Sequence, residues 1–214
     1  MLTVLGRATS SNVQLVMWAI GELGLAYNRL DYGHVHGGLD TPEYLAMNPN
    51  GTVPTLQDGD LVIWESCAIL RYLGARYGDD AFWPTDTVRR AKVDMWAEWA
   101  KLNFASRFTV PIFWSRVRTS ATDRDETALE RGVANFEQAL SILEEQIGNK
   151  SYVTGNNFTA ADIVVGHVLY RWFDIDVPRR RRPVIEAYYQ RLTERPAYRE
   201  HVMTDYSALQ VAGA

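Results

Sequence analysis

The 214-residue chain is predicted to fold as a mixed α/β domain followed by an all-helical domain. Residues 1–79 alternate strand and helix signals in the order β-α-β-α-β-β-α, whereas residues 87–214 carry only helical periodicity. Residues 80–86 between them have no period and indicate a linker. A crossover helix joins the first two strands and a hairpin joins the last two, so the sheet is expected to be mixed.

The elements of the first domain are short and closely spaced. Apolar residues at helical spacing follow Ser10 and Ser11, either of which can cap a helix. Thr41 and Pro42 are typical of a helix start, and Asp58-Gly59 is typical of a hairpin turn. In order, we expect a strand at 2–7, a helix at 10–25, a strand at 26–32, a loop at 34–40, a short helix at 41–47, a hairpin around 52–64 and a helix at 65–78.

The second domain is predicted to be a bundle. Pro111 is expected to end or kink its first helix. Thr159 and Asp162 are spaced as a capping box, in which each side chain bonds the other residue's backbone N–H. We interpret Asp162 as structural, because nothing nearby in the sequence supplies a chemical partner. The helices are expected over 87–109, 125–148, 158–173 and 183–195.

Composition narrows the functional class. The net charge of −4 provides no overall basic footprint for nucleic acid. A single cysteine, Cys67, excludes an intrachain disulfide framework and fits a reducing compartment. The sequence suggests neither a leader peptide nor an apolar run long enough to span a bilayer. We therefore expect a cytoplasmic protein without nucleic-acid or membrane partners.

Two segments place polar side chains at predicted helix starts. The hydroxyls of residues 8–14 (ATSSNVQ) can cap the first helix or bond a bound nucleophile. At WES (64–66), Glu65 can hold an ammonium group, and Ser66 with the free N–H groups of the helix can hold a carboxylate. The alternative for WES is a serine cap with an acidic first turn.

The order and spacing of TSSNVQ, TPEYLAMNPNGTVPTL, WESCAILRYL and FTAADI resemble the cytosolic glutathione transferases over essentially the entire chain. The pattern is most similar to bacterial members related to the theta, phi and nu classes. The resemblance implies a thioredoxin-like first domain, a helical second domain and a homodimer. It also implies that glutathione is a co-substrate, with no other cofactor and no metal.

The resemblance also assigns roles to individual residues. Glu65 and Ser66 match the pair that holds the γ-glutamyl end of glutathione. Val53 matches the residue whose backbone pairs with the cysteinyl part, ahead of a cis proline, Pro54. Thr52 belongs to the same glutathione-binding segment.

The residue that serves the glutathione sulfur is left open among three neighbours. Ser10 matches the hydroxyl after the first strand, and Asn12 matches an asparagine of the nu-like members. Ser11 remains a third candidate, because a one-residue slip changes the match. Hydrogen bonds to a thiolate lower the pKa of the thiol, and a free thiol near pKa ~8.5 is mostly protonated at neutral pH.

Several positions depart from the family pattern. Ser10 stands where thiol-transferase-like members have cysteine, which argues against a mixed disulfide with the enzyme. Leu39 and Asp40 replace basic residues that hold the glycine carboxylate in phi-like members, and His36 is a candidate substitute. Cys67 is interpreted as a packing residue.

The co-substrate pocket is expected to take a small apolar electrophile and to lie between the ATSSN loop and the long helices. Its candidates are Phe104, Arg107, Phe108 and Trp114, each of which can equally be a core residue. The basic run PRRRRP (178–183) is interpreted as a solvated loop, with an anion or acidic-partner contact as the alternative.

The resulting hypothesis is a glutathione transferase that attacks small electrophiles with the glutathione thiolate and can reduce peroxides. One alternative is a glutathione-fold binding protein without catalysis. Another is a zeta-like isomerase, whose Ser-Ser-Cys signature is half met by Ser10, Ser11 and Asn12.

Overall fold

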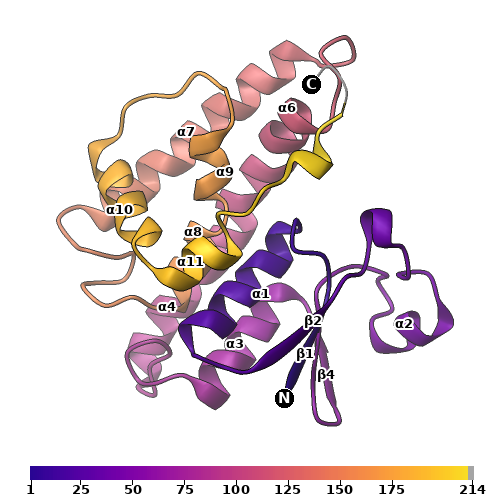
Figure 1. Cartoon of the computed structure of the whole chain (residues 1–214). Coiled ribbons are helices and arrows are strands. Elements are labelled where there is room, and N and C mark those ends of the chain that lie inside the picture. Colours follow the sequence, from indigo (N-terminus) through magenta and orange to yellow (C-terminus); the bar gives the residue numbers. More distant parts are fainter. Residues whose placement is uncertain (212–214) are drawn as a thin grey trace.

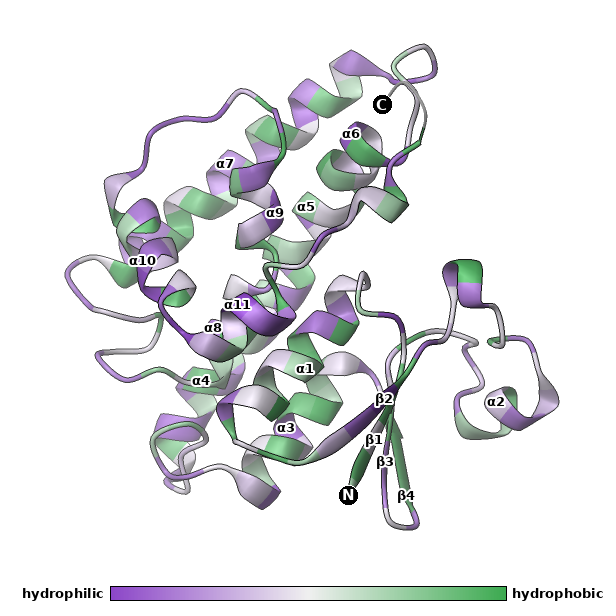
Figure 2. Cartoon of the chain, in the orientation of Figure 1, coloured by the Kyte–Doolittle hydropathy of each residue, from purple (hydrophilic) through white to green (hydrophobic). Residues whose placement is uncertain are grey.

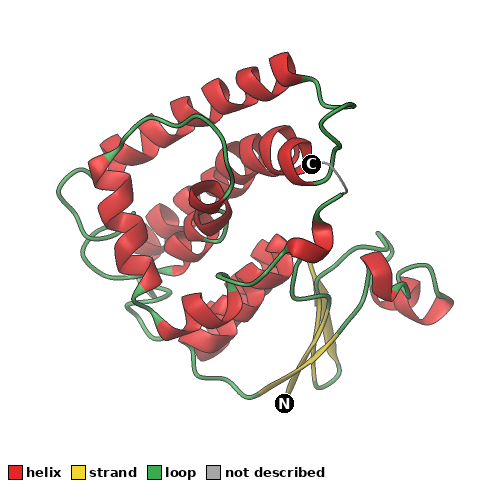
Figure 3. Cartoon of the chain, turned by 45° about the horizontal axis from the view of Figure 1, so that its top comes forward, coloured by secondary structure: helices red, strands yellow, loops and turns green. Residues whose placement is uncertain are grey.

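The computed structural model describes residues 1–211 and places a small sheet at one end of a helical assembly. Figure 1 shows the strands and α2 at the lower right, with the helices of the second domain to the left of and above them. Figure 3 shows the same separation, with all strands gathered at one end of the molecule. Within residues 1–211, no helix has both the length and the apolar character that a membrane crossing requires.

The sheet has four strands in the order β2-β1-β3-β4. Strand β1 pairs in parallel with β2 and antiparallel with β3, and β3 pairs antiparallel with β4. The mixed sheet predicted from the crossover and the hairpin is therefore confirmed. The strands are β1 (Leu2–Leu5), β2 (Tyr27–Leu30), β3 (Thr55–Asp58) and β4 (Leu61–Trp64).

Three helices accompany the sheet, and they start close to the predicted positions: α1 (Ser11–Glu22), α2 (Pro42–Met47) and α3 (Ser66–Tyr77). The hydroxyl of Thr41 accepts a hydrogen bond from the Tyr44 N–H at 3.3 Å, as its role as a cap requires. The hydroxyl of Ser10, by contrast, makes no capping bond to α1. Helix α1 packs against α3, whereas α2 lies apart from both (Figure 1).

The second domain is built from helices joined by loops, with no strand among its described residues. After α4 (Thr87–Trp99) the chain passes through a π-helix (Ala100–Ala105), α5 (Ser106–Phe108), a second π-helix (Thr109–Trp114) and α6 (Ser115–Val117). The remaining elements of this domain are α7 (Glu126–Ile147), α8 (Ala160–Gly166), α9 (Leu169–Asp174), α10 (Pro183–Thr193), α11 (Pro196–His201) and a short 3-10 turn at Ser207–Leu209. Another 3-10 turn, His34–His36, lies in the first domain between β2 and α2.

Pro111 does not end the helical path, which corrects one of the two outcomes expected for it. Pro111 lies inside the second π-helix, and the chain stays helical to Val117. The wider π turn changes the backbone pairing where the proline has no N–H to donate. Gly132 on α7 faces Pro111, where a Cβ atom would lie 3.1 Å from the Pro111 Cβ. The bulge is therefore packed closely against the longest helix.

The predicted helix at 158–173 is two helices, because the chain breaks between α8 and α9 at His167 and Val168. The capping box of Thr159 and Asp162 is present as predicted. Asp162 also accepts hydrogen bonds from the Val153 N–H and the Tyr188 hydroxyl, so it connects three segments of the bundle.

One apolar core runs through both domains, and Figure 2 shows apolar residues along the helices of both. Trp18 on α1 is fully buried, and its ring packs against Tyr198 of α11 at 4.7 Å between centroids. The segment expected to be a linker is itself packed, since Phe82 and Trp83 are buried in this core. The last described residues cross from α11 to α6 (Figure 1), where the Val211 N–H bonds the Val117 carbonyl.

Candidate functional site

The hydroxyl-rich segment lies where β1 ends and α1 begins. Thr9, Ser10, Ser11 and Asn12 all line one cavity of about 280 Å³ between the two domains. Ser10 is the N-cap residue with extended backbone angles, and its hydroxyl forms no hydrogen bond with any other residue in 1–211. Its O–H is therefore available to donate to a bound group.

Lys101, on the first π-helix, joins the starts of α1 and α3. Its ammonium donates to the Asn12 Oδ1 at 2.6 Å and to the Ser66 Oγ at 3.2 Å. Because the Asn12 carbonyl oxygen is occupied in this way, the amide NH₂ of Asn12 remains as the donor. One cation is thus placed beside both helix starts, where it favours negative charge on a bound molecule.

Val53 is held at the edge of this cavity by a buried polar cluster. The Val53–Pro54 peptide bond is cis, as expected, and both Thr52 and Val53 line the cavity. Hydrogen bonds from the Tyr44 hydroxyl (2.6 Å) and the Asn48 amide (2.8 Å) fix the Thr52 carbonyl. Tyr44 and Asn48 are each 1% exposed, so burial and these bonds together fix the loop.

Glu65 precedes α3 in a left-handed backbone conformation, with φ of +70°. This region is costly for residues other than glycine, and such residues concentrate at ligand sites. The Glu65 side chain is exposed, whereas Ser66 is buried at 2% exposure and the next residue, Cys67, is buried as well. Burial raises the pKa of the Cys67 thiol, in keeping with a packing residue.

Three arginines line the same cavity: Arg7 after β1, Arg118 after α6 and Arg171 on α9. Arg171 is only 3% exposed and donates to the Thr9 carbonyl at 2.7 Å, next to Ser10. Burial lowers the pKa of Arg171 to about 10, and the nearby charge of Arg7 also contributes to lowering it. Burial and the charge of Arg118 lower the pKa of Arg7.

The residues predicted for the electrophile pocket are divided. Trp114 lines the cavity, together with Thr109, Phe113 and Leu209 from the second domain. Phe104 and Phe108 are instead buried in the core, with their rings against Phe136. The Arg107 guanidinium donates to the Asn135 carbonyl at 3.4 Å and does not line the cavity.

The residue suggested for the glycine carboxylate lies apart from this cavity. His36 is exposed, and its Nε2 is 4.0 Å from an Asp31 oxygen. His34 instead lines a neighbouring hollow of about 340 Å³ that shares Leu39 and Gly51 with the main cavity.

Sequence reasoning missed Lys101, the three arginines, Phe113 and Leu209. The lysine reaches Asn12 across 89 positions and Arg171 reaches Thr9 across 162, so no local pattern connects them. Arg7 had one visible signal, since it is a charged residue between an apolar strand and the hydroxyl cluster.

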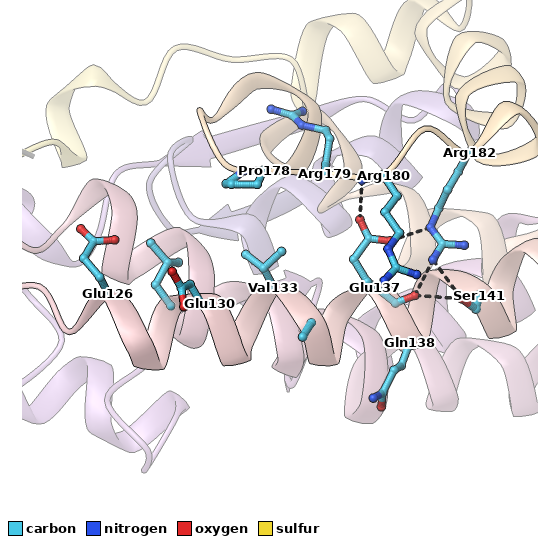
Figure 4. Close-up of a pocket in the computed structure, with 12 residues that line it drawn as sticks. Glu126, Glu130, Val133, Glu137, Gln138, Ser141, Pro178, Arg179, Arg180 and Arg182 are labelled. Atoms are coloured by element: carbon cyan, nitrogen blue, oxygen red, sulfur yellow. Dashed lines mark hydrogen bonds and ion pairs between the residues drawn. The ribbon is translucent and has the colours of Figure 1, made fainter.

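The basic run 178–183 is not a freely solvated loop. Arg182 forms ion pairs of 2.7 Å with Glu137 and with Glu144 on α7, and Arg179 donates to the carbonyls of Trp172 and Phe173. These contacts border a hollow of about 830 Å³ (Figure 4). Arg179 and Arg182 therefore anchor the connection between α9 and α10, whereas Arg180 and Arg181 are exposed as predicted for a solvated loop.

Comparison with known proteins places this geometry in a family. Residues 1–75 match the model of the glutathione S-transferase N-terminal domain, and residues 126–191 match that of the C-terminal domain. Glutathione S-transferase GstB of Escherichia coli strain K12 is 35% identical, over 97% of this chain and all of that protein. The chain belongs to the glutathione S-transferase family.

Solved transferases share the whole fold. A theta-class glutathione S-transferase from Xanthomonas axonopodis pv. citri, with glutathione bound, is 41% identical, with a TM-score of 0.91 over 95% of this chain and 98% of that one. Glutathione transferase BmGSTD1 of Bombyx mori is 26% identical, with a TM-score of 0.86 over 97% of this chain and 95% of that one. The predicted thioredoxin-like domain followed by a helical domain is confirmed.

Proposed function

We propose that this glutathione S-transferase binds glutathione along the edge formed by Glu65, Ser66 and Val53 and activates its thiol at Ser10 and Asn12. The observation that carries the proposal is a single cavity lined by Ser10, Asn12 and Val53. Lys101 places a positive charge beside this cavity, where its ammonium bonds Asn12 at the start of α1. An extended tripeptide pairs with the Val53 backbone as it would with a strand edge. Its γ-glutamyl carboxylate meets the N–H groups at the start of α3.

The thiolate is stabilised by donors that the folded chain already holds in place. The Ser10 hydroxyl and the Asn12 NH₂ each supply one hydrogen bond to sulfur, and α1 contributes its positive end. A downward pKa shift of two units requires about 2.7 kcal/mol. Two charge-assisted hydrogen bonds suffice, at about 1.5–3 kcal/mol each. The thiolate then attacks a small electrophile packed against Phe113, Trp114 and Leu209.

The test is a measurement of the pKa of the bound thiol from the ultraviolet absorbance of the thiolate in the enzyme–glutathione complex. Ser10→Ala and Asn12→Ala are each expected to raise that pKa by about 1–2 units and to lower kcat for 1-chloro-2,4-dinitrobenzene. Ser11→Ala tests the third candidate and should leave the pKa of the bound thiol unchanged. If neither Ser10→Ala nor Asn12→Ala moves the pKa, the assignment is wrong.

Lys101 is proposed as a positioning residue that acts through Asn12. Lys101→Met is expected to raise the pKa of the bound thiol, because it removes a nearby positive charge and releases the Asn12 oxygen. Lys150→Met, just after the end of α7, is the control and should leave the pKa unchanged. A fall in stability without a change in this pKa would contradict the positioning role.

The same thiolate is proposed to reduce hydroperoxides. Attack on the outer oxygen forms a sulfenic intermediate and an alcohol, and a second glutathione then releases water and glutathione disulfide. Turnover of cumene hydroperoxide that falls together with turnover of 1-chloro-2,4-dinitrobenzene in Asn12→Ala supports one shared site. A binding protein without catalysis would retain glutathione yet show neither turnover, and a zeta-like isomerase would instead isomerise a cis-dienoic acid.

We also propose a homodimer in a reducing, cytoplasmic setting, which the buried free thiol of Cys67 fits. Val88 and Met95 lie two turns apart on one face of α4 and are 64% and 58% exposed, an apolar stripe that a second copy can cover. Sedimentation should detect a dimer that Met95→Glu weakens. The control Val110→Glu, at another exposed apolar position, should not weaken it.

A further inference from the structure

The cavity beside Ser10 is lined by three guanidinium groups and by no carboxylate from residues 1–211. Arg7, Arg118 and Arg171 come from three distant parts of the chain, and the fold brings them to one wall. Like charges gathered without counter-charges destabilise a folded protein. Such a cluster is therefore the physical signature of a site completed by an anion.

Arg171 is the most informative of the three. It is 3% exposed, its guanidinium carbon lies 4.4 Å from the centre of the Phe113 ring, and it donates to Thr9. The Nε of Arg171 and the Nε of Arg7 are buried without any hydrogen-bond partner in the described chain. A buried donor left unpaired costs about 1–3 kcal/mol, which an anionic acceptor would remove.

Arg118 is the third arginine that lines the cavity, and it is only partly buried. Its guanidinium carbon lies 4.5 Å from the centre of the Trp114 ring, which is itself 43% exposed. The stacking orients the fork of donors without using its N–H groups. Arg118 forms no ion pair within residues 1–211, whereas its neighbour Arg116 pairs with Asp176.

We infer that this cavity selects small electrophiles that carry a carboxylate, with Arg7, Arg118 and Arg171 as the specificity-determining residues. The inference rests on the transferase activity proposed above and names its substrate class. Guanidinium forks match carboxylate geometry, and the faces of Phe113 and Trp114 take the apolar body of the molecule. The same charges offset the repulsion between an approaching thiolate and an anionic substrate.

The first experiment compares 4-chloro-3-nitrobenzoate with 4-chloro-3-nitrobenzamide, which differ in charge and little in shape. In both, the thiolate sulfur bonds to the ring carbon and chloride leaves with the C–Cl electron pair. Each kcat/KM is divided by the uncatalysed rate constant with glutathione, which removes intrinsic reactivity. The wild-type protein should favour the acid, and Arg118→Gln or Arg7→Gln should reduce this preference about tenfold. Arg116→Gln is the matched control and should preserve it.

The kinetics also show whether the arginines bind the carboxylate of the electrophile or a carboxylate of glutathione. If the arginines hold the acidic electrophile, Arg118→Gln raises KM for the acid and leaves KM for glutathione unchanged. A rise in the glutathione KM with both electrophiles would assign the arginines to glutathione itself and overturn the inference. An equal corrected rate for the acid and the amide in the wild-type protein would overturn it as well.

Calorimetry with 3-nitrobenzoate, which has no leaving group, tests the site independently of turnover. The wild-type protein should bind 3-nitrobenzoate more tightly than 3-nitrobenzamide, and Arg118→Gln should lose the difference. If this pattern holds while no electrophile is turned over, the anion site stands and the transferase proposal fails. If the wild-type protein binds neither compound, the inference fails whatever the turnover.

Discussion

Gly6 shows how a single atom controls the geometry of the site. It lies at the end of β1, where a Cβ atom would come 2.5 Å from the Val13 Cγ2 and 3.2 Å from the Val53 Cβ. Strand β1, helix α1 and the loop before Pro54 therefore meet at this residue without room for a methyl group. The position of the Val53 backbone depends on that close approach.

Gly6→Ala is expected to lower the free energy of unfolding by about 1–3 kcal/mol more than Gly155→Ala, because only the first substitution creates an overlap. Gly155 is a matched control: its φ is +156°, against +155° for Gly6, and no atom lies within 4 Å of its added Cβ. Urea unfolding measures both. Equal losses in the two variants would mean that backbone conformation, rather than close contact with Val13 and Val53, is the reason for glycine at position 6.

At the scale of elements, local signals in the sequence were sufficient for most of the fold. The Thr41-Pro42 start, the Asp58-Gly59 turn and the Thr159–Asp162 capping box each act within a few residues, and the structure contains all three. The break between α8 and α9 and the π-helices of 100–114 were missed. They depend on packing between distant elements, as at Gly132 and Pro111.

The residues of the candidate site show the same difference between local signals in the sequence and contacts made only in the tertiary fold. The segments around Ser10, Val53 and Ser66 were visible because each adjoins a turn or a helix start. Lys101 and Arg171 come from helix interiors, where a basic residue ordinarily indicates a solvated face. Only the tertiary fold turns these two side chains toward the cavity.

Helix α8 and its end hold two fully buried titratable groups with opposite pH responses. Burial, partly offset by four hydrogen bonds, raises the pKa of Asp162 to about 6. Burial lowers the pKa of His167 to about 3. Unfolding between pH 4 and 6 therefore releases a proton from Asp162 and takes one up at His167. The stabilisation linked to Asp162 is lost as pH rises, and that linked to His167 is lost as pH falls.

The effects of Asp162 and His167 on the pH dependence of the free energy of unfolding should therefore cancel in the wild-type protein. Variants that remove one group should reveal the effect of the other. Between pH 4 and 6, the free energy of unfolding of His167→Gln should fall with rising pH by about 1.4 kcal/mol per unit relative to wild type. That of Asp162→Asn should rise by about the same amount relative to wild type. Urea unfolding across this range measures the slopes. If the free energy of unfolding has the same pH dependence in the wild-type protein and in both variants, the opposite pKa shifts of Asp162 and His167 are contradicted.

At the scale of the whole molecule, the two domains share a core and cannot be treated as separate folding units. Trp18 of α1 packs against Tyr198 and Phe158 of the second domain. Gly166 of α8 lies so close that a Cβ atom would come 2.8 Å from the Trp18 ring. The candidate site lies between the same two domains, so its geometry depends on their contact.

The ion pair between Glu22 and Arg195 stabilises this contact, and its removal should weaken both domains together. Glu22 accepts hydrogen bonds from Arg195 at 2.6 and 2.7 Å and from the Trp18 indole N–H at 2.7 Å, and its side chain is 11% exposed.

Glu22→Gln is expected to lower the free energy of unfolding by about 2–3 kcal/mol, less than the loss of a fully buried pair. The control Asp80→Asn weakens a solvent-exposed pair with Arg89 and should destabilise the protein less than Glu22→Gln does. Tryptophan fluorescence and far-ultraviolet circular dichroism should follow one coincident transition in every variant. Two separated transitions in Glu22→Gln would show that the domains unfold independently.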